Sequence, residues 1–212
     1  MVPAAFNFDL WMSALPVLLL AATFTWLLSL LVRRVSVVEP LKSLMLFAAG
    51  VTYGLDADPR APRLAFVLWL LALWAVHRSI YVMVRGRGKD EDPFYQALRE
   101  RHEPRFRWKS LYLVFWLQAL VAWIVSLPLL GAFASNAPLG LLDYSGILLW
   151  LTGLVLEAGA WRRTRHPNYY GSLCVWWGLW CVAVAAGGWW SVAGPLLLSL
   201  GIHPRLRRWV AP

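Results

Sequence analysis

Long apolar runs separated by short polar stretches dominate the chain. The first run covers residues 10–32 and contains no charged side chain, so a helix over it is long enough to cross a hydrocarbon core about 30 Å thick. No Lys or Arg precedes Arg33, so the run lacks the basic segment that begins a signal peptide. The pattern predicts a retained transmembrane helix.

Further apolar stretches follow this run along the chain. They lie at about residues 43–55, 64–84, 110–130, 139–160 and 173–202. The last one contains Gly187-Gly188-Trp189-Trp190, and paired glycines favour a turn between two shorter helices. The apolar pattern by itself therefore allows either six or seven transmembrane helices.

The distribution of Lys and Arg decides between these two counts, because cytoplasmic loops of membrane proteins are enriched in basic residues. With seven helices and an outside N-terminus, 17 of the 20 basic residues are cytoplasmic, whereas Arg60 and Arg63 lie outside. The cytoplasmic segments are then 33–42, 85–109, 161–172 and 203–212. Six helices would leave the last of these segments outside. We therefore expect an all-α integral membrane protein, residues 1–212 forming one domain of seven helices with a cytoplasmic C-terminus.

Composition supports the membrane interpretation and excludes other classes. Hydrophobic residues make up 60% of the chain and charged residues 15%, whereas soluble domains carry about 25% charged residues. The net charge of +9 comes from residues next to apolar runs, so we expect no nucleic-acid binding. Cys174 and Cys181 would lie about 10 Å apart along one helix, beyond disulfide reach. Four His and two Cys show no metal-ligand spacing.

Ionisable side chains inside apolar helices are costly, so each needs a partner or a function. His77, Tyr81 and Arg85 follow an i, i+4, i+8 spacing that places them on one helical face. Arg78 lies beside this face, and Glu157 lies near the cytoplasmic end of another predicted helix. Two interpretations remain open: an Arg78–Glu157 ion pair that orders the bundle, or a group of side chains that binds a ligand.

The polar segment 85–109 predicts a short helix of its own. Asp92 and Pro93 are residue types preferred at the N-cap and the first helical position. Arg99 and Glu103 are spaced for an i, i+4 ion pair. The apolar face of this helix would consist of Phe94, Tyr95 and Leu98. Such a helix either lies on the membrane headgroups or covers a cavity that opens to the cytoplasm.

The segment WRRTRHPNYYGS, residues 161–172, is unusually polar for a stretch between two apolar runs. Pro167 favours a turn at His166 and suits the first turn of a following helix. Free backbone N–H groups at that helix start, with three nearby arginines, would bind an anion. Asn168 and Tyr169 add further hydrogen-bonding groups. A basic membrane anchor accounts for the arginines but does not require the His-Pro-Asn-Tyr-Tyr-Gly sequence.

Several segments along the chain resemble those of a known protein family. They are RRVSVVE (33–39), HRSIYVMVRGRG (77–88), EDPFYQALRERH (91–102), SLYLVFWLQALVAWIVSLPL (110–129), PLGLLDYSGILLWLTGLVLEA (138–158), RHPNYYG (165–171) and the apolar segment 171–198. Together they resemble the membrane steroid 5-alpha-reductase superfamily, especially its bacterial branch, over most of the chain.

This resemblance implies a seven-helix reductase in the inner membrane of a bacterium. It implies NADPH in a cavity open to the cytoplasm, and hydride transfer to the conjugated C=C of an enone in a steroid-like or other lipid. An acidic group near the carbonyl oxygen would stabilise the enolate that develops. Glu39 is the motif-based candidate for this role, and Tyr81 is a candidate from its helical face alone. The residues that match cofactor-binding positions are Arg85, Arg87, Glu157, Arg165, His166, Asn168 and Tyr169.

The chain also departs from the pattern of the superfamily. Ser172 stands where the relatives carry Glu after the motif glycine, and Ala160 joins Trp161 directly where they carry a polar loop. The relatives also continue into a basic tail after the last apolar helix. These differences belong to the implied cofactor cavity, so we expect NADPH to bind weakly.

Two other functions stay open. Isoprenylcysteine-type membrane methyltransferases share a similar Arg-His-Pro-x-Tyr-x-Gly turn and use S-adenosylmethionine. A non-catalytic membrane protein derived from the reductase fold would account for the missing segments. The arginine-rich cytoplasmic rim favours the reductase, because NADPH carries more phosphate than S-adenosylmethionine. The expected partners are a lipid-soluble small molecule and the membrane lipids.

Overall fold

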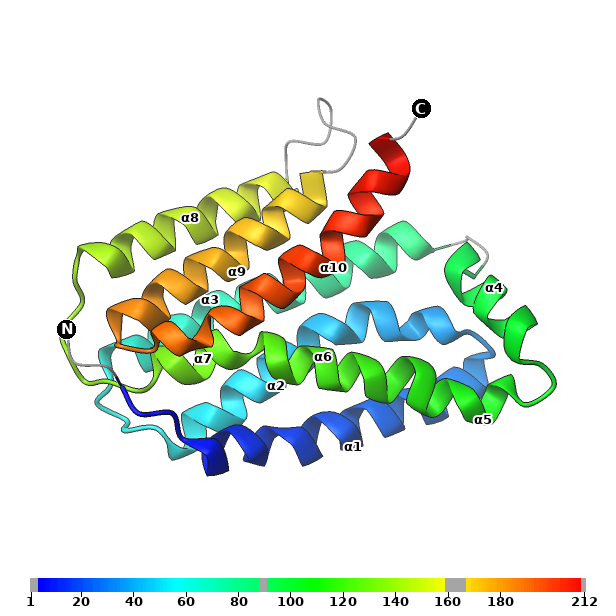
Figure 1. Cartoon of the computed structure of the whole chain (residues 1–212), viewed down its shortest axis with the longest axis horizontal. Coiled ribbons are helices and arrows are strands. Elements are labelled where there is room, and N and C mark those ends of the chain that lie inside the picture. Colours follow the sequence, from blue (N-terminus) through cyan, green and yellow to red (C-terminus); the bar gives the residue numbers. More distant parts are fainter. Residues whose placement is uncertain (1–3, 88–90, 159–166, 211–212) are drawn as a thin grey trace.

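In the computed structural model, the described residues form an elongated bundle of ten α-helices (Figure 1). The structure describes the backbone of residues 4–87, 91–158 and 167–210, and the side chains of this set except 167–169 and 202–210. No strand occurs in these ranges. The helices are α1 (Phe8–Val32), α2 (Val38–Asp56), α3 (Pro62–Gly86), α4 (Pro93–His102), α5 (Phe106–Ser110), α6 (Leu117–Val125), α7 (Leu127–Ala132), α8 (Leu141–Ala158), α9 (Pro167–Ala185) and α10 (Ala193–Val210).

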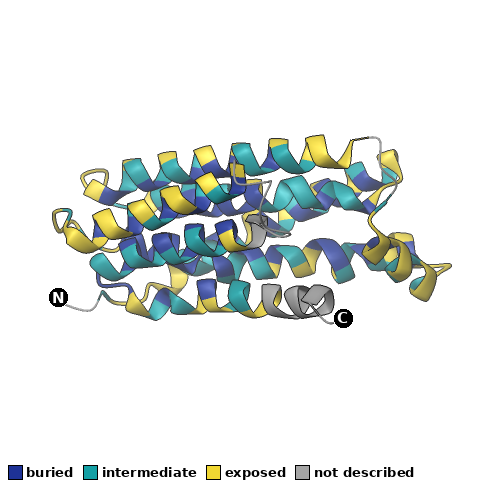
Figure 2. Ribbon diagram, turned by 90° about the horizontal axis from the view of Figure 1, so that it is seen from above, coloured by how far each residue is buried: buried dark blue, intermediate teal, exposed yellow. Residues whose placement is uncertain are grey.

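Five helical segments in the described ranges are long and apolar enough to cross a membrane. They are Phe8–Val32, Val35–Asp56, Pro62–Gly86, Phe106–Ala132 and Leu141–Ala158. The fourth runs through α5, a π-helical stretch, α6 and α7. Many large apolar side chains are exposed, and Figure 2 shows exposed positions along the outward faces of the helices. Leu20, Trp69 and Leu148, for example, are 65–76% exposed. An apolar exterior of this kind is suited to lipid, so the chain is built as a multi-pass membrane protein.

The last apolar run breaks at the paired glycines, as the sequence predicts. Helix α9 ends at Ala185, and Gly187 adopts a left-handed backbone conformation with φ of 90°. A Cβ atom on Gly188 would lie 2.7 Å from the Cα of Gly131 in α7, so only glycine lets the turn approach this closely. The chain then continues as α10, and the run forms two helices.

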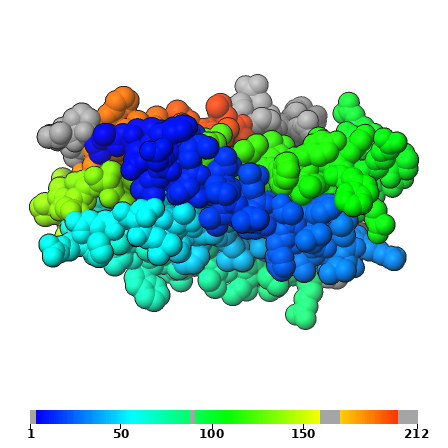
Figure 3. Space-filling view, turned by 90° about the horizontal axis from the view of Figure 1, so that it is seen from below, coloured from blue at the N-terminus to red at the C-terminus, as the bar shows by residue number. Residues whose placement is uncertain are grey.

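Close contact between α8 and α9 depends on glycines on both helices. A Cβ atom on Gly146 would lie 2.6 Å from the carbonyl oxygen of Gly178, and one on Gly153 would lie 2.6 Å from that of Gly171. Small residues at these positions let the helix backbones touch, which is how helices associate in lipid. In the rest of the bundle, α2 packs against α1 and α3, and α7 packs against α9. Figure 3 shows α1 beside the segment that contains α5 and α6.

The two ends of the bundle differ in character. The described basic segments, 33–42 and 91–109 with Arg85 and Arg87, gather at the end where α4 crosses the bundle (Figure 1). We call this the basic end. The N-terminal segment lies at the other end, where the backbone N–H of Ala4 donates to the carbonyl of Gly187.

Two local expectations need correction and one is confirmed. Asp92 does cap α4, because its side chain accepts a hydrogen bond from the Phe94 N–H. Arg99 pairs with Glu91 at 2.8 Å, so the predicted Arg99–Glu103 pair is wrong. The reason is that α4 ends at His102 and Glu103 has extended backbone, which removes the i, i+4 geometry that the pair requires.

The predicted start of the second helix was also wrong. Helix α2 begins at Val38 rather than near residue 43. Glu39 and Lys42 therefore lie in the first turns of a helix, although they were expected in a cytoplasmic segment. An acidic side chain in the first turn is favoured by the helix dipole.

Candidate functional site between helices α3 and α8

Helices α3 and α8 are joined by side chains rather than by close backbone packing. Toward the basic end, Arg78 of α3 and Glu157 of α8 lie 3.8 Å apart, Nη1 to Oε1. The predicted Arg78–Glu157 ion pair is therefore confirmed, at a distance too long for a hydrogen bond. Ser172 of α9 donates its hydroxyl hydrogen to the same Glu157 oxygen at 2.5 Å. Three helices thus meet at one carboxylate that is only 1% exposed.

Among the residues whose side chains the structure describes, five on α3 and α8 carry a buried polar atom without a hydrogen-bond partner. These atoms are His77 Nδ1, Arg78 Nη1 and Glu157 Oε2, together with the indole nitrogens of Trp74 and Trp150. Trp74, His77 and Arg78 are spaced i, i+3, i+4 and so lie on one face of α3. A buried polar atom left unpaired costs roughly 1–3 kcal/mol, more when it is charged. The five atoms therefore suit a ligand or solvent that supplies the missing hydrogen bonds. We call these five residues the seam.

An aromatic contact borders the seam. The rings of Trp74 in α3 and Trp176 in α9 meet edge to face, with centroids 5.7 Å apart. Trp74, Trp150 and Trp176 are at most 4% exposed. Trp74 of α3 therefore contacts the α8–α9 pair through the ring of Trp176.

Tyr81 and Arg85 lie one and two turns beyond His77, toward the basic end. Arg85 donates from Nη1 to the Tyr81 hydroxyl oxygen at 2.7 Å, which confirms that these two side chains share a face. Arg85 and Arg87 are exposed at the end of α3, where cations can meet an anionic ligand. His77 makes no hydrogen bond through its buried Nδ1 within the described part of the chain.

Glu39 belongs to a different set of contacts. It accepts hydrogen bonds from the Tyr95 hydroxyl of α4 and from Lys42 Nζ, the latter at 2.6 Å. Among the described contacts, Glu39 and Tyr81 therefore have different partners. Their predicted action on one substrate carbonyl stays a prediction.

The family comparison can be set beside this geometry. A family model described as a protein of unknown function (DUF1295) matches residues 25–160 and 155–203. The chain belongs to the DUF1295 family. This family is steroid 5-alpha-reductase-like in general, which agrees with the resemblance found in the sequence. No curated protein and no solved structure matches the chain.

Part of the predicted cofactor site of this DUF1295 protein falls outside the described residues. Arg165 and His166 lie in the undescribed segment 159–166. Asn168 and Tyr169 belong to the backbone of α9, which begins at Pro167, but their side chains are outside the described set. The predicted roles of these four residues therefore stay predictions.

Sequence reasoning missed one buried ion pair. Arg63 was expected in an outside loop but lies in the first turn of α3, where it pairs with Asp143 of α8. The two residues are 1% and 0% exposed. Asp143 was the available signal, because it is an acidic residue inside the apolar run 139–160 and such residues need a partner.

The pairing of Tyr95 with Glu39 was also missed. Tyr95 was assigned to the apolar face of α4, and it is indeed buried. Its hydroxyl nevertheless reaches across to α2. A buried tyrosine usually finds a hydrogen-bond partner for its polar end, but its identity depends on the tertiary structure.

Proposed function

We propose that this protein is a membrane-embedded reductase that uses NADPH to reduce a conjugated C=C in a lipid-soluble substrate. Steroid-like and other isoprenoid-derived enones are the substrate class. The observation that carries this proposal is the group of buried polar atoms on α3 and α8, including one each from Arg78 and Glu157, that have no hydrogen-bond partner among the described residues. Family membership gives the proposal its reaction class.

The residues present fit a polar anionic cofactor. NADPH, when bound, would supply a hydride to the carbon β to the substrate carbonyl. Arg85 and Arg87 offer exposed cations at the end of α3, which suits phosphate. Glu157 Oε2 and His77 Nδ1 offer unpaired hydrogen-bonding atoms deeper in the seam. We assign Arg165, His166, Asn168 and Tyr169 to the same cofactor by resemblance.

Ser172 has a defined part in this arrangement. Its hydroxyl donates to Glu157 Oε1, and this bond together with Arg78 fixes the carboxylate while Oε2 stays unpaired. A glutamate in place of Ser172 would put a second negative charge against Glu157. Ser172 therefore takes the place of an acidic residue that would contact the cofactor, and it orients Glu157 instead. The loss of that acidic contact supports weak cofactor binding.

Two side chains are proposed to act on the substrate. Tyr81 accepts a hydrogen bond from Arg85, so the nearby guanidinium would stabilise negative charge that develops on the phenol oxygen as it donates its proton. Glu39 is held by Tyr95 and Lys42. In a reductase of this class, such groups orient the carbonyl and stabilise the enolate oxygen.

The proposed topology has seven transmembrane helices, an outside N-terminus and a cytoplasmic basic end. The alternation of the long helices in Figure 1 supports it, because α1, α3, α8 and α10 all run toward the basic end. Single cysteines introduced at positions 60, 100, 135 and 205 would test it in intact cells. Positions 100 and 205 should be shielded from an impermeant reagent, and positions 60 and 135 should be labelled. Labelling of position 205 from outside would refute seven helices.

Cofactor binding is the decisive experiment. NADPH and S-adenosylmethionine should be titrated in parallel against the detergent-solubilised protein, with quenching of its 15 tryptophans as the signal. We expect weak binding of NADPH, reduced further in Arg165→Ala, Asn168→Ala and Glu157→Gln. Each lost charge-assisted contact should weaken binding by roughly tenfold or more. Arg60→Ala, at the opposite end of the bundle, is the matched control.

Each other outcome identifies a different function. If NADPH binds tightly and none of the three substitutions changes its affinity, segment 161–172 is a membrane anchor. Binding of S-adenosylmethionine alone would indicate a methyltransferase. Binding of neither would indicate a non-catalytic protein.

Substrate entry gives a separate test. Because the seam lies between apolar helices, a reductase here should prefer substrates that arrive from the bilayer. Steroid-like enones should be turned over faster than small hydrophilic enones under the same conditions. Equal rates for both would contradict entry through lipid.

A further inference from the structure

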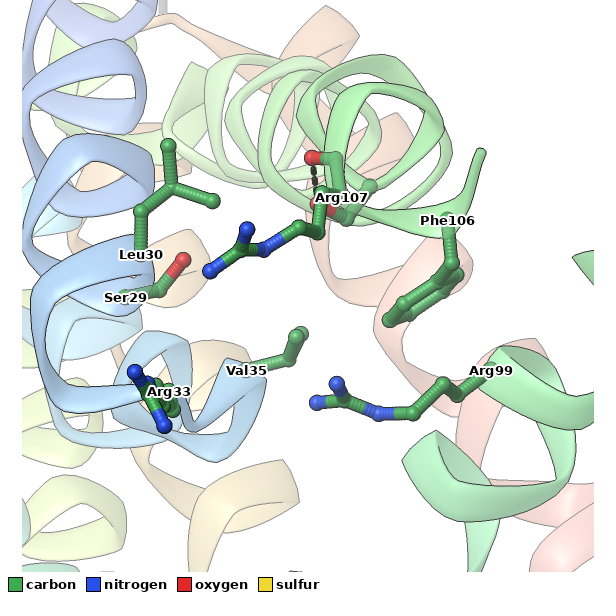
Figure 4. Close-up of a pocket in the computed structure, with 8 residues that line it drawn as sticks. Ser29, Leu30, Arg33, Val35, Arg99, Phe106 and Arg107 are labelled. Atoms are coloured by element: carbon green, nitrogen blue, oxygen red, sulfur yellow. Dashed lines mark hydrogen bonds between the residues drawn. The ribbon is translucent and has the colours of Figure 1, made fainter. Parts of the chain in front are cut away.

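A cavity separate from the seam lies between the end of α1 and the α4–α5 region. It has a volume of about 90 Å³ and is lined by Ser29, Leu30, Arg33, Val35, Arg99, Phe106, Arg107 and Ser110. Figure 4 shows Arg99 and Arg107 reaching toward the same space, with Arg33 at its edge. We propose that this cavity binds the phosphate group of an anionic phospholipid from the surrounding membrane.

The lining of the cavity carries positive charge. Arg99 pairs with Glu91 at 2.8 Å and lies over the ring of Phe106, with its guanidinium carbon 5.2 Å from the ring centroid. The charge of Arg99 is therefore compensated by Glu91, and both contacts hold its side chain in place. The guanidinium groups of Arg33 and Arg107 form no ion pair with any described residue. Two uncompensated cations thus border one small cavity, which favours an anion.

The hydrogen-bonding groups of the lining point to the same kind of ligand. The Ser29 hydroxyl donates to the carbonyl of Trp26, and the Ser110 hydroxyl donates to the carbonyl of Arg107. The backbone N–H of Val35 donates to Glu91. These donors are already used, so the arginines are the groups that a ligand would meet. A ligand that only accepts hydrogen bonds, such as a phosphate oxygen, matches this lining.

The backbone at Arg33 adopts an unusual conformation. It has φ of 57° and ψ of 29°, and it is the one residue other than glycine with positive φ in the described ranges. A helix that ends in this left-handed conformation usually places glycine there, because a side chain adds strain. Strain of this kind concentrates at functional sites. An arginine at this position therefore indicates that its side chain is needed at the cavity.

A lipid fits better than free phosphate because apolar side chains flank the cationic lining. Leu31 and Val32 precede Arg33 and are 80% and 57% exposed, and Trp108 follows Arg107 and is 70% exposed. These residues lie where a long apolar helix gives way to basic residues, the level at which headgroups meet tryptophan and arginine side chains. A phospholipid would occupy both surfaces at once: its phosphate would contact the arginines and its acyl chain would contact the apolar residues. The cavity is also held rigidly, because the Trp26 indole donates to the Arg107 carbonyl.

Native mass spectrometry of the full-length protein in detergent would test this proposal. Phosphatidylglycerol, phosphatidylcholine and inorganic phosphate should be titrated separately. We expect retention of phosphatidylglycerol, weaker retention of phosphatidylcholine and no displacement by inorganic phosphate at equal concentration. Arg107→Gln should weaken phosphatidylglycerol binding by roughly threefold to tenfold, and Arg107→Lys by less, because lysine keeps the charge but loses the planar fork.

Two further variants make the test specific. Arg33→Gly suits the left-handed backbone, so it should keep the fold and still lose affinity for phosphatidylglycerol. Arg101→Gln removes an equal charge from an exposed position on α4 that does not line the cavity, and it should bind as the wild type does. The midpoint temperature at which helical structure is lost on heating checks that each variant is folded. If Arg33→Gly is not folded, Arg107→Gln is the variant that tests the proposal.

Three results would overturn the proposal. Equal loss of binding in Arg101→Gln would mean general attraction by the basic end. Retention of phosphatidylcholine equal to that of phosphatidylglycerol would mean that the net negative charge of the lipid is not recognised. Inorganic phosphate that binds as tightly as the lipid would mean a free-phosphate site.

Discussion

The Arg63–Asp143 pair allows a quantitative prediction about stability. Arg63 donates from Nε and Nη2 to the two carboxylate oxygens of Asp143, both at 2.8 Å. It also donates to the carbonyls of Ala137 and Pro138 at 2.8 and 3.3 Å. Asp143 in turn accepts the Gly140 N–H at 2.8 Å. The pair is buried and each of its side-chain nitrogen and oxygen atoms is hydrogen-bonded, so removing either partner alone should be costly.

The expected magnitudes follow from what each substitution leaves behind. Arg63→Met leaves a buried carboxylate with one backbone N–H as its partner, and Asp143→Leu leaves a buried guanidinium with two carbonyls. Breaking a buried pair from one side costs about 3–5 kcal/mol. Replacing both partners by apolar residues of similar size is often close to neutral. The double variant should therefore be several kcal/mol more stable than the sum of the single changes predicts.

Unfolding by sodium dodecyl sulfate in mixed micelles, followed by far-UV circular dichroism, would measure these differences. Arg60→Met is the matched control, because Arg60 is exposed near the same end of α3. A single loss of about 4 kcal/mol corresponds to nearly a thousandfold change in the unfolding equilibrium. The reasoning fails if Arg63→Met is no less stable than Arg60→Met, or if the single effects simply add in the double variant.

Three further predictions concern packing and local order, and the same unfolding assay serves the first two. Gly153→Ala should destabilise the protein by about 1–3 kcal/mol, because its Cβ atom would lie 2.6 Å from a backbone oxygen of α9; Gly201→Ala, with nothing within 4 Å of its Cβ, should have little effect. Tyr53→Phe should cost about 1 kcal/mol, because the lost hydroxyl contacts Ser126 at 2.8 Å in the core, whereas Tyr112→Phe at an exposed position should cost nothing measurable. Tyr95→Phe should speed amide hydrogen exchange in α4, since this hydroxyl joins α4 to Glu39; unchanged exchange there would show that other contacts hold the helix.

Much of the fold can be predicted from the sequence because it depends on local patterns. The uncharged run before Arg33 becomes α1, and the paired glycines at 187–188 separate α9 from α10. Asp92 caps α4 because a carboxylate one residue before a helix can accept a backbone N–H. These features need only neighbouring residues. The start of α2 was misplaced because Glu39 and Lys42 are polar, although they form an ion pair within the helix at 2.6 Å.

The partners of the buried polar residues could not be predicted in the same way. The contact between Tyr95 and Glu39 joins residues 56 positions apart in the sequence, and that between Arg63 and Asp143 joins residues 80 apart. A spacing rule covers only one helix, so it cannot select such partners. The Arg78–Glu157 pair was one of two interpretations that the sequence left open, because both are ionisable groups expected inside apolar helices at similar depth. The same argument, applied to Asp143, would have required a buried cation near the outside end.

The two ion pairs between α3 and α8 differ in a way that bears on the proposed ligand site. Arg63 pairs with Asp143 and Arg78 with Glu157, at almost equal sequence separations, so the helices run in the same direction and in register. At the end away from the basic segments, the Arg63–Asp143 pair is bidentate and fully satisfied. Toward the basic end, the Arg78–Glu157 contact is long, and a buried polar atom of each residue has no hydrogen-bond partner within the described part of the chain. An ion pair that served only to hold two helices together would have its polar atoms hydrogen-bonded, as the Arg63–Asp143 pair does. The difference supports our proposal that a polar ligand binds at the Arg78–Glu157 pair.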